Sequence, residues 1–109
     1  MSEVELKNRL NKMDFHFSTK TADDLPMQLR PNLVTDDGDL LIYVDEEGSE
    51  MDNLFEAVGK TIVLREYLYK NDLNNKYTVT LVLLVSQFLR LKKELRQVLT
   101  QEVPLLVIH

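Results

Sequence analysis

The side chains best suited to acid–base or metal chemistry near neutral pH are two histidines, His16 and His109. Neither belongs to a His-x-x-x-His or His-Glu pattern, and the chain has no cysteine. We therefore expect no histidine or thiolate metal site, no nucleophilic cysteine and no disulfide. The alternation around His16 places it on the polar side of a strand.

Two acidic clusters, DDGD at 36–39 and DEEG at 45–48, resemble fragments of a calcium loop. Neither has oxygen ligands at alternating positions closed by a glutamate, so we interpret both as solvated turns. Ser49 lacks the flanking pattern of a nucleophilic serine, and no phosphate-binding glycine loop is present. The sequence predicts no catalytic, cofactor-binding or metal-binding residue, and we expect a protein that is not an enzyme.

Charge is distributed unevenly along the chain, whose net charge is −5. Residues 14–56 contain twelve acidic and two basic residues, whereas residues 57–109 contain eight basic and four acidic residues. No aromatic residue lies among the basic positions from Arg90 to Arg96 for base stacking, and the net charge is negative, which argues against nucleic-acid binding. The acidic stretch is either a solvated surface or a face for a basic target.

The chain has 109 residues, 44% of them apolar and 28% charged, which fits one globular domain over residues 1–109. The first ten residues, MSEVELKNRL, carry charges where a signal peptide would be apolar. The absence of cysteine is typical of a reducing compartment. We expect an intracellular protein of the cytoplasm or the nucleus.

The first half of the chain predicts short elements. A helix over 3–13 can be capped by Ser2, and DFHFST (14–19) alternates like a half-buried strand. The apolar and aromatic run at 40–45 follows a glycine turn, so we expect a small antiparallel sheet from 14–18 and 40–45, with 33–35 as an optional third strand.

A helix is predicted to start at Ser49 and to end near Lys70, with Asp52 completing a capping box. Apolar residues form two stripes along this helix. One stripe contains Met51, Phe55, Val58, Ile62 and Tyr69, and the other contains Leu54, Leu64 and Leu68.

The segment from Tyr77 to about residue 101 combines two signals. Its apolar residues follow an unbroken 4-3 spacing without glycine or proline, which predicts one long helix. The β-branched residues at 77–85 favour the alternative of a strand followed by a shorter helix. The uncharged run is too short to span a bilayer as a helix, so we expect no membrane span.

These elements predict an α+β fold. A long helical hairpin over about 49–101, with 49–70 packed antiparallel against the C-terminal helix, would pack with the small antiparallel sheet and the short N-terminal helix. Pro104 ends the last helix, and the apolar run at 105–108 should either join the sheet at 40–45 or bind a partner.

The function that this pattern favours is a protein–protein interaction module, an adaptor or a small subunit of a larger complex. Its partner would be another protein or a second copy, in a homo- or hetero-oligomer bound through a coiled-coil-like seam and the tail. The candidate partner-binding residues are Phe88, Leu91, Leu95, Val98, Leu99, Leu105, Leu106 and Ile108. The alternative is a small acidic inhibitor or immunity-type regulator that binds a basic target through residues 14–56.

Overall fold

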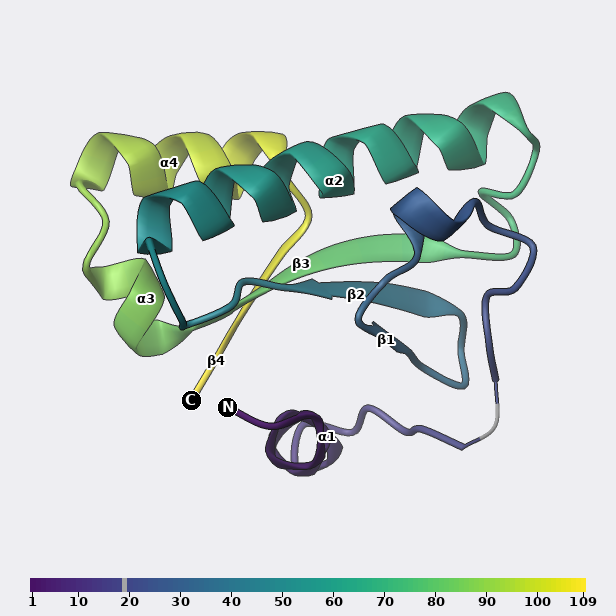
Figure 1. Cartoon of the computed structure of the whole chain (residues 1–109), viewed down its shortest axis with the longest axis horizontal. Helices are drawn as coiled ribbons and strands as arrows, with labels where there is room; N and C mark the ends of the chain where they lie inside the picture. The colour runs from purple at the N-terminus through teal and green to yellow at the C-terminus, as the bar shows by residue number, and fades with distance from the viewer. Residues whose placement is uncertain (19) are drawn as a thin grey trace.

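The computed structural model describes residues 1–18 and 20–109 and has a four-stranded sheet at its centre (Figure 1). The strands are β1 (Leu33–Val34), β2 (Asp39–Tyr43), β3 (Thr78–Leu84) and β4 (Leu105–Ile108), in the order β1-β2-β3-β4. β1 pairs with β2 in the antiparallel sense, whereas β2, β3 and β4 run parallel. The sheet is therefore mixed.

Helices cover both faces of this sheet. α2 (Glu50–Lys70) and α4 (Lys93–Glu102) form a layer on one face, and α1 (Glu3–Asn11) crosses the other face (Figure 1). The short α3 (Val85–Leu89) continues directly from β3, and a turn of 3₁₀ helix, η1 (Met27–Leu29), lies in the connector before β1. None of the described helices is both long enough and apolar enough to cross a membrane.

The local signals for α1 and α2 are confirmed. The Ser2 hydroxyl accepts from the Glu5 backbone N–H at 3.2 Å, and the Ser49 hydroxyl accepts from the Asp52 N–H at 3.4 Å. Each serine thus satisfies one of the N–H groups that a helix start leaves without an intrahelical partner.

The prediction of a long helical hairpin over about 49–101 is wrong, although the predicted α+β class is correct. Residues 78–84 form β3 rather than helix, and the longest helix is α2, with 21 residues. β3 returns the chain between the two helices, so α2 and α4 run in the same direction rather than antiparallel (Figure 1). A parallel strand needs such a crossover connection, which α2 provides between β2 and β3.

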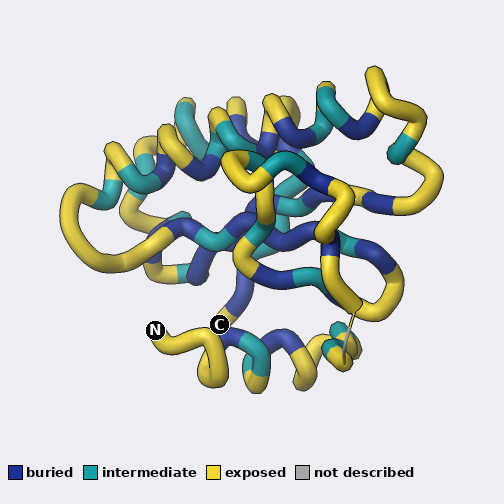
Figure 2. Tube along the Cα trace, turned by 45° about the vertical axis from the view of Figure 1, so that its right-hand side comes forward, coloured by how far each residue is buried: buried dark blue, intermediate teal, exposed yellow. Residues whose placement is uncertain are grey.

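β3 forms because both of its faces are buried (Figure 2). Val79, Leu81 and Leu83 belong to the main core under α2 and α4, whereas Val82 and Leu84 belong to a second core under α1. A strand covered on both sides is apolar at nearly every position. Such a run satisfies helical spacing as readily as strand spacing, which is why periodicity misassigned it.

The expected antiparallel sheet is partly wrong. β1 and β2 pair as an antiparallel ribbon, but residues 14–18 form no strand, and Thr19 lies outside the described residues. Phe15 and Phe17 instead pack against the second core. The tail does join the sheet as β4, but on β3 rather than on 40–45.

Gly38 closes the turn between β1 and β2 with a φ of +88°. A Cβ at this position would lie 2.5 Å from the carbonyl oxygen of Lys76, whereas one at Gly48, with φ +83°, would meet nothing within 4 Å. The two glycines share the backbone constraint and differ in their surroundings, so they form a matched pair.

We predict that Gly48→Ala lowers the free energy of unfolding by about 1 kcal/mol through positive φ alone. Gly38→Ala should lower it by roughly 2 kcal/mol or more, because the backbone around Lys76 must also move. Urea unfolding followed by circular dichroism measures both. Equal losses for the two variants would show that the contact with Lys76 does not constrain the turn.

Candidate functional site

An apolar cleft of about 350 Å³ lies at the carboxyl ends of β2 and β3. Met51 and Leu54 of α2 form one wall, Leu91 forms the other, and Val44 and Leu83 contribute from the strands. We call this the apolar cleft. The carboxyl edge of parallel strands is where open α/β sheets most often bind ligands.

A buried glutamine holds this edge of the sheet together. Gln87 of α3 is 5% exposed, its side-chain oxygen accepts from the Leu84 N–H at 2.8 Å, and its side-chain nitrogen donates to the Val44 carbonyl at 3.0 Å. One side chain therefore satisfies a backbone carbonyl after the end of β2 and a backbone N–H at the end of β3. Gln87 is positioned for structure rather than for chemistry on a ligand.

Gln87→Leu should remove both bonds and leave a buried N–H and a buried carbonyl without partners, at a cost of about 1–3 kcal/mol. Ser86→Ala, at the exposed neighbouring position, should change stability by less than about 0.5 kcal/mol. Chemical denaturation of both variants checks this. If Gln87→Leu is as stable as Ser86→Ala, the amide does not tie the strand ends.

An ion pair crosses the rim of the apolar cleft. The Arg90 guanidinium contacts the Glu50 carboxylate with two nitrogens, and this hydrogen bonding raises the pKa of Arg90. Both side chains are largely exposed, so solvent screening leaves the pair little effect on stability. It does hold the start of α2 beside the end of α3.

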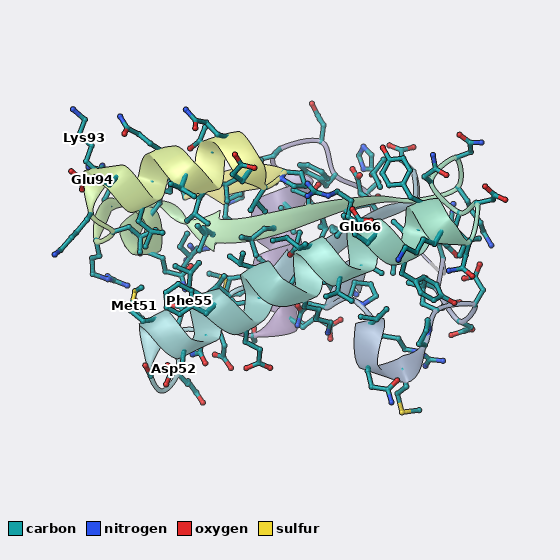
Figure 3. All side chains as sticks on the ribbon, turned by 90° about the horizontal axis from the view of Figure 1, so that it is seen from above. Met51, Asp52, Phe55, Glu66, Lys93 and Glu94 are labelled. Atoms are coloured by element: carbon teal, nitrogen blue, oxygen red, sulfur yellow. The ribbon has the colours of Figure 1, made fainter. Side chains whose placement is uncertain are left out.

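An exposed apolar stripe continues from the cleft along α2. Met51, Phe55, Ile62 and Tyr69 are exposed, with 57% of Phe55 accessible, and Figure 3 shows Met51 and Phe55 on the flank of α2 turned toward α4. The stripe also includes the half-buried Val58. We call these five residues the apolar stripe.

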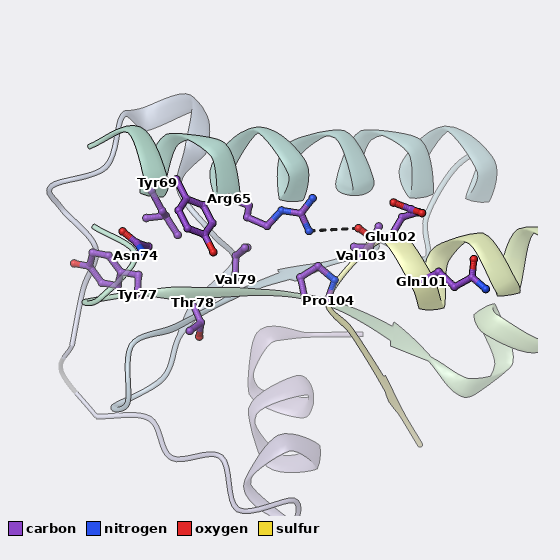
Figure 4. A pocket seen from close by; sticks show the side chains of 11 residues that line it. Arg65, Tyr69, Asn74, Tyr77, Thr78, Val79, Gln101, Glu102, Val103 and Pro104 are labelled. Carbon is purple, nitrogen blue, oxygen red and sulfur yellow. Dashed lines mark hydrogen bonds between the residues drawn. The ribbon is translucent and has the colours of Figure 1, made fainter. Parts of the chain in front are cut away.

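A second cleft, of about 440 Å³, lies at the opposite end of α2 (Figure 4). It is bordered by Tyr69 and by Arg65, whose guanidinium donates to the Glu102 carbonyl at 3.3 Å. Glu102 is the one carboxylate among the residues lining this cleft, and they include no histidine. The residues lining this second cleft therefore include no paired acid and base for proton transfer.

Tyr77 lines the second cleft, and its hydroxyl group bonds to a residue that lies outside the cleft lining. Its hydroxyl donates to Asp24 Oδ1 at 2.7 Å, and Lys76 Nζ lies 2.9 Å from Asp24 Oδ2. These two bonds, the one from Tyr77 foremost, lower the pKa of Asp24. They tie the connector before β1 to the start of β3.

Because the pKa of Asp24 is lower in the folded chain than in the unfolded chain, its ionised form stabilises the fold above the ordinary pKa. This contribution is lost as pH falls through the folded value. We predict that Asp24→Asn is less stable than the wild type near neutral pH and that the difference shrinks below about pH 4. Melting temperatures of both chains across this range measure it. A difference that does not change with pH would contradict the ionic origin.

The histidines and the acidic clusters lie apart from both clefts. His16 and His109 are exposed, and the described residues contain no group of three or more His, Asp or Glu side chains that could hold a metal ion. Eight of the twelve acidic residues of 14–56 lie at the two ends of β2, in the 36–39 turn and between Asp45 and Asp52, and the other four lie elsewhere.

The structure separates the predicted partner-binding residues. Leu91 lines the apolar cleft, and Val98 of α4 is 52% exposed. Leu99 and Ile108 are buried, and the remaining four are half-buried: Phe88, Leu95, Leu105 and Leu106. Leu106 and Ile108 pack under α1, on the opposite face of the sheet from Leu95 and Leu105.

Sequence reasoning missed Met51 and Phe55 as surface residues. One signal could have identified them. A helix lying on a sheet buries one stripe, so of two apolar stripes on α2 one had to remain outside. Leu54, Leu64 and Leu68, with Ala57 and Thr61, are the buried set.

Comparison of the chain with models of known protein families, with curated proteins and with solved structures finds no match.

Proposed function

We propose that this protein is a non-enzymatic interaction module that binds another protein through the apolar cleft and the apolar stripe. The observation that carries the proposal is the exposure of Met51 and Phe55 beside a concave apolar site. Single exposed apolar residues are ordinary on protein surfaces, but a stripe continuous with a cleft is typical of binding surfaces.

The form of the surface indicates the form of the partner segment. The cleft has a volume of about 350 Å³, which is large enough to accept an apolar side chain, and the stripe extends from it over several turns of α2. An amphipathic helix presents apolar residues at matching three- and four-residue intervals. We expect such a helix, anchored by a large aliphatic or aromatic residue in the apolar cleft.

Charge at the rim supports an amphipathic partner. Glu50 of α2 lines the cleft on one side, whereas Arg90, Lys92 and Lys93 lie on the side of α3 and α4. Asp52 lies on the opposite flank of α2 from Met51 and Phe55 (Figure 3). A partner helix with charges of both signs beside its apolar face could pair with both rims. Such rim charges orient a complex more than they stabilise it.

The alternative of an acidic regulator rests on the net charge of residues 14–56. The separation of these acids between the two ends of β2 gives it no single face, so the apolar surface is the proposal that the geometry favours. Salt dependence separates the two modes. Binding by an acidic surface weakens steeply as ionic strength rises, whereas apolar binding does not.

We predict that Phe55→Asp leaves the chain folded and reduces partner binding by at least about tenfold, since a charge replaces an apolar interface anchor. Val63→Asp is the matched control, because Val63 is 53% exposed on α2 but lies outside the stripe. Each chain is immobilised and exposed to extract from its source, and retained proteins are quantified at low and high salt.

A protein retained equally by wild type and Val63→Asp at both salt concentrations, and lost with Phe55→Asp, would support the proposal. Retention unaffected by Phe55→Asp would contradict it. Retention lost at high salt with all three chains would favour the acidic alternative. Circular dichroism establishes that both variants keep the wild-type fold.

A further inference from the structure

The outer edge of β4 is open. Within the described part of the chain, β4 pairs with β3 on one side and with no strand on the other. Its residues LLVI carry no charge, and Leu105, Leu106 and Val107 are only half-buried. Edge strands are usually protected by charged side chains, prolines, bulges or short length. β4 is short, with four residues and Pro104 directly before it, but no charge, proline or bulge lies within Leu105–Ile108.

The pairing with β3 fixes which backbone groups point outward. The Leu81 N–H donates to the Pro104 carbonyl at 2.8 Å, and Leu81 to Leu84 align with Leu105 to Ile108. Because backbone groups alternate in direction along a strand, those of residues 104, 106 and 108 face β3. The N–H and C=O groups of Leu105 and Val107 therefore face away from the sheet.

We propose that this edge pairs with the same edge of a second copy, as an antiparallel β4–β4 pair centred on Leu106. The two outward-facing residues are placed symmetrically about Leu106. A two-fold axis through that position pairs Leu105 of each chain with Val107 of the other, which satisfies all four outward groups of each strand. The proposal goes beyond the apolar cleft and does not depend on it.

The side chains agree with self-pairing. Leu106 meets its own copy on the α1 face, and Leu105 meets Val107 of the other chain on the α2–α4 face. No charged residue lies on β4, so the two-fold axis brings no like charges together there. Val107 is half-buried and belongs to neither core cluster.

The dimer has a defined shape and strength. A two-fold axis perpendicular to the sheet joins two sheets into one of eight strands and places both α2–α4 layers on the same side. A contact between four-residue strands falls below the standard interface of about 1,600 Å². We therefore expect a dissociation constant between about 10 and 500 µM. The dimer would carry two apolar clefts that face in one direction.

Single cysteines test the register, because the chain has no cysteine of its own. In the proposed pair, residue 106 faces itself at a non-hydrogen-bonded position, where the Cα atoms are about 4.5 Å apart and suit a disulfide. Residue 107 lies opposite 105, so two copies of 107 are too far apart. Under mild oxidation Leu106→Cys should form a disulfide-linked dimer at least about tenfold faster than Val107→Cys.

Sedimentation of the full chain between about 10 and 500 µM should show concentration-dependent dimerisation. Val107→Lys should raise the dimer dissociation constant at least about tenfold, whereas Val63→Lys should leave it unchanged. A monomer throughout this range overturns the proposal. Equal cross-linking at 106 and 107, or a dimer unaffected by Val107→Lys, also overturns it. The sedimentation comparison applies even if cysteine at 106 disturbs packing under α1.

Discussion

The structure depends on the burial of β3 on both faces and along both edges. Its side chains enter two separate cores, and its backbone pairs with β2 on one side and β4 on the other. Leu81 and Val82 are adjacent in the sequence, both are completely inaccessible, and they point to opposite faces. Burying a leucine or valine side chain contributes about 1.5–3 kcal/mol, and β3 supplies five of the 22 buried apolar residues in the described part of the chain.

The parallel arrangement of β2, β3 and β4 determines where the helices lie. Each crossover must travel back along the sheet, so α2 and α4 start at the carboxyl ends of the strands and run the same way (Figure 1). Their starting ends meet beside Val44 and Leu83, where Gln87 satisfies the backbone groups of both strand ends. The apolar cleft is therefore a consequence of the topology. Its position results from where the crossovers begin, not from any local motif.

Two surfaces of the described residues, 1–18 and 20–109, have no covering element. The apolar stripe on α2 is left outside because one helix on one sheet buries one stripe. The outer edge of β4 is left open because the sheet ends there. These surfaces differ in kind, since one offers apolar side chains and the other offers backbone hydrogen-bonding groups as well. Under the two proposals above, the protein would bind one partner at the helix layer while pairing with its own copy at the sheet edge.

The sequence by itself determined the features whose causes are local. The serine caps of α1 and α2, the glycine turn before β2 and the end of α4 at Pro104 each depend on a few adjacent residues. It also indicated that 105–108 must be ordered. Only the tertiary structure decided that 78–84 is a strand, since apolar residues at almost every position fit both periodicities until two faces cover them. The same holds for α2, where either apolar stripe could have been buried. The position of the sheet selected Leu54, Leu64 and Leu68 and left Met51 and Phe55 exposed, because burial depends on which elements meet in space rather than on spacing along one of them.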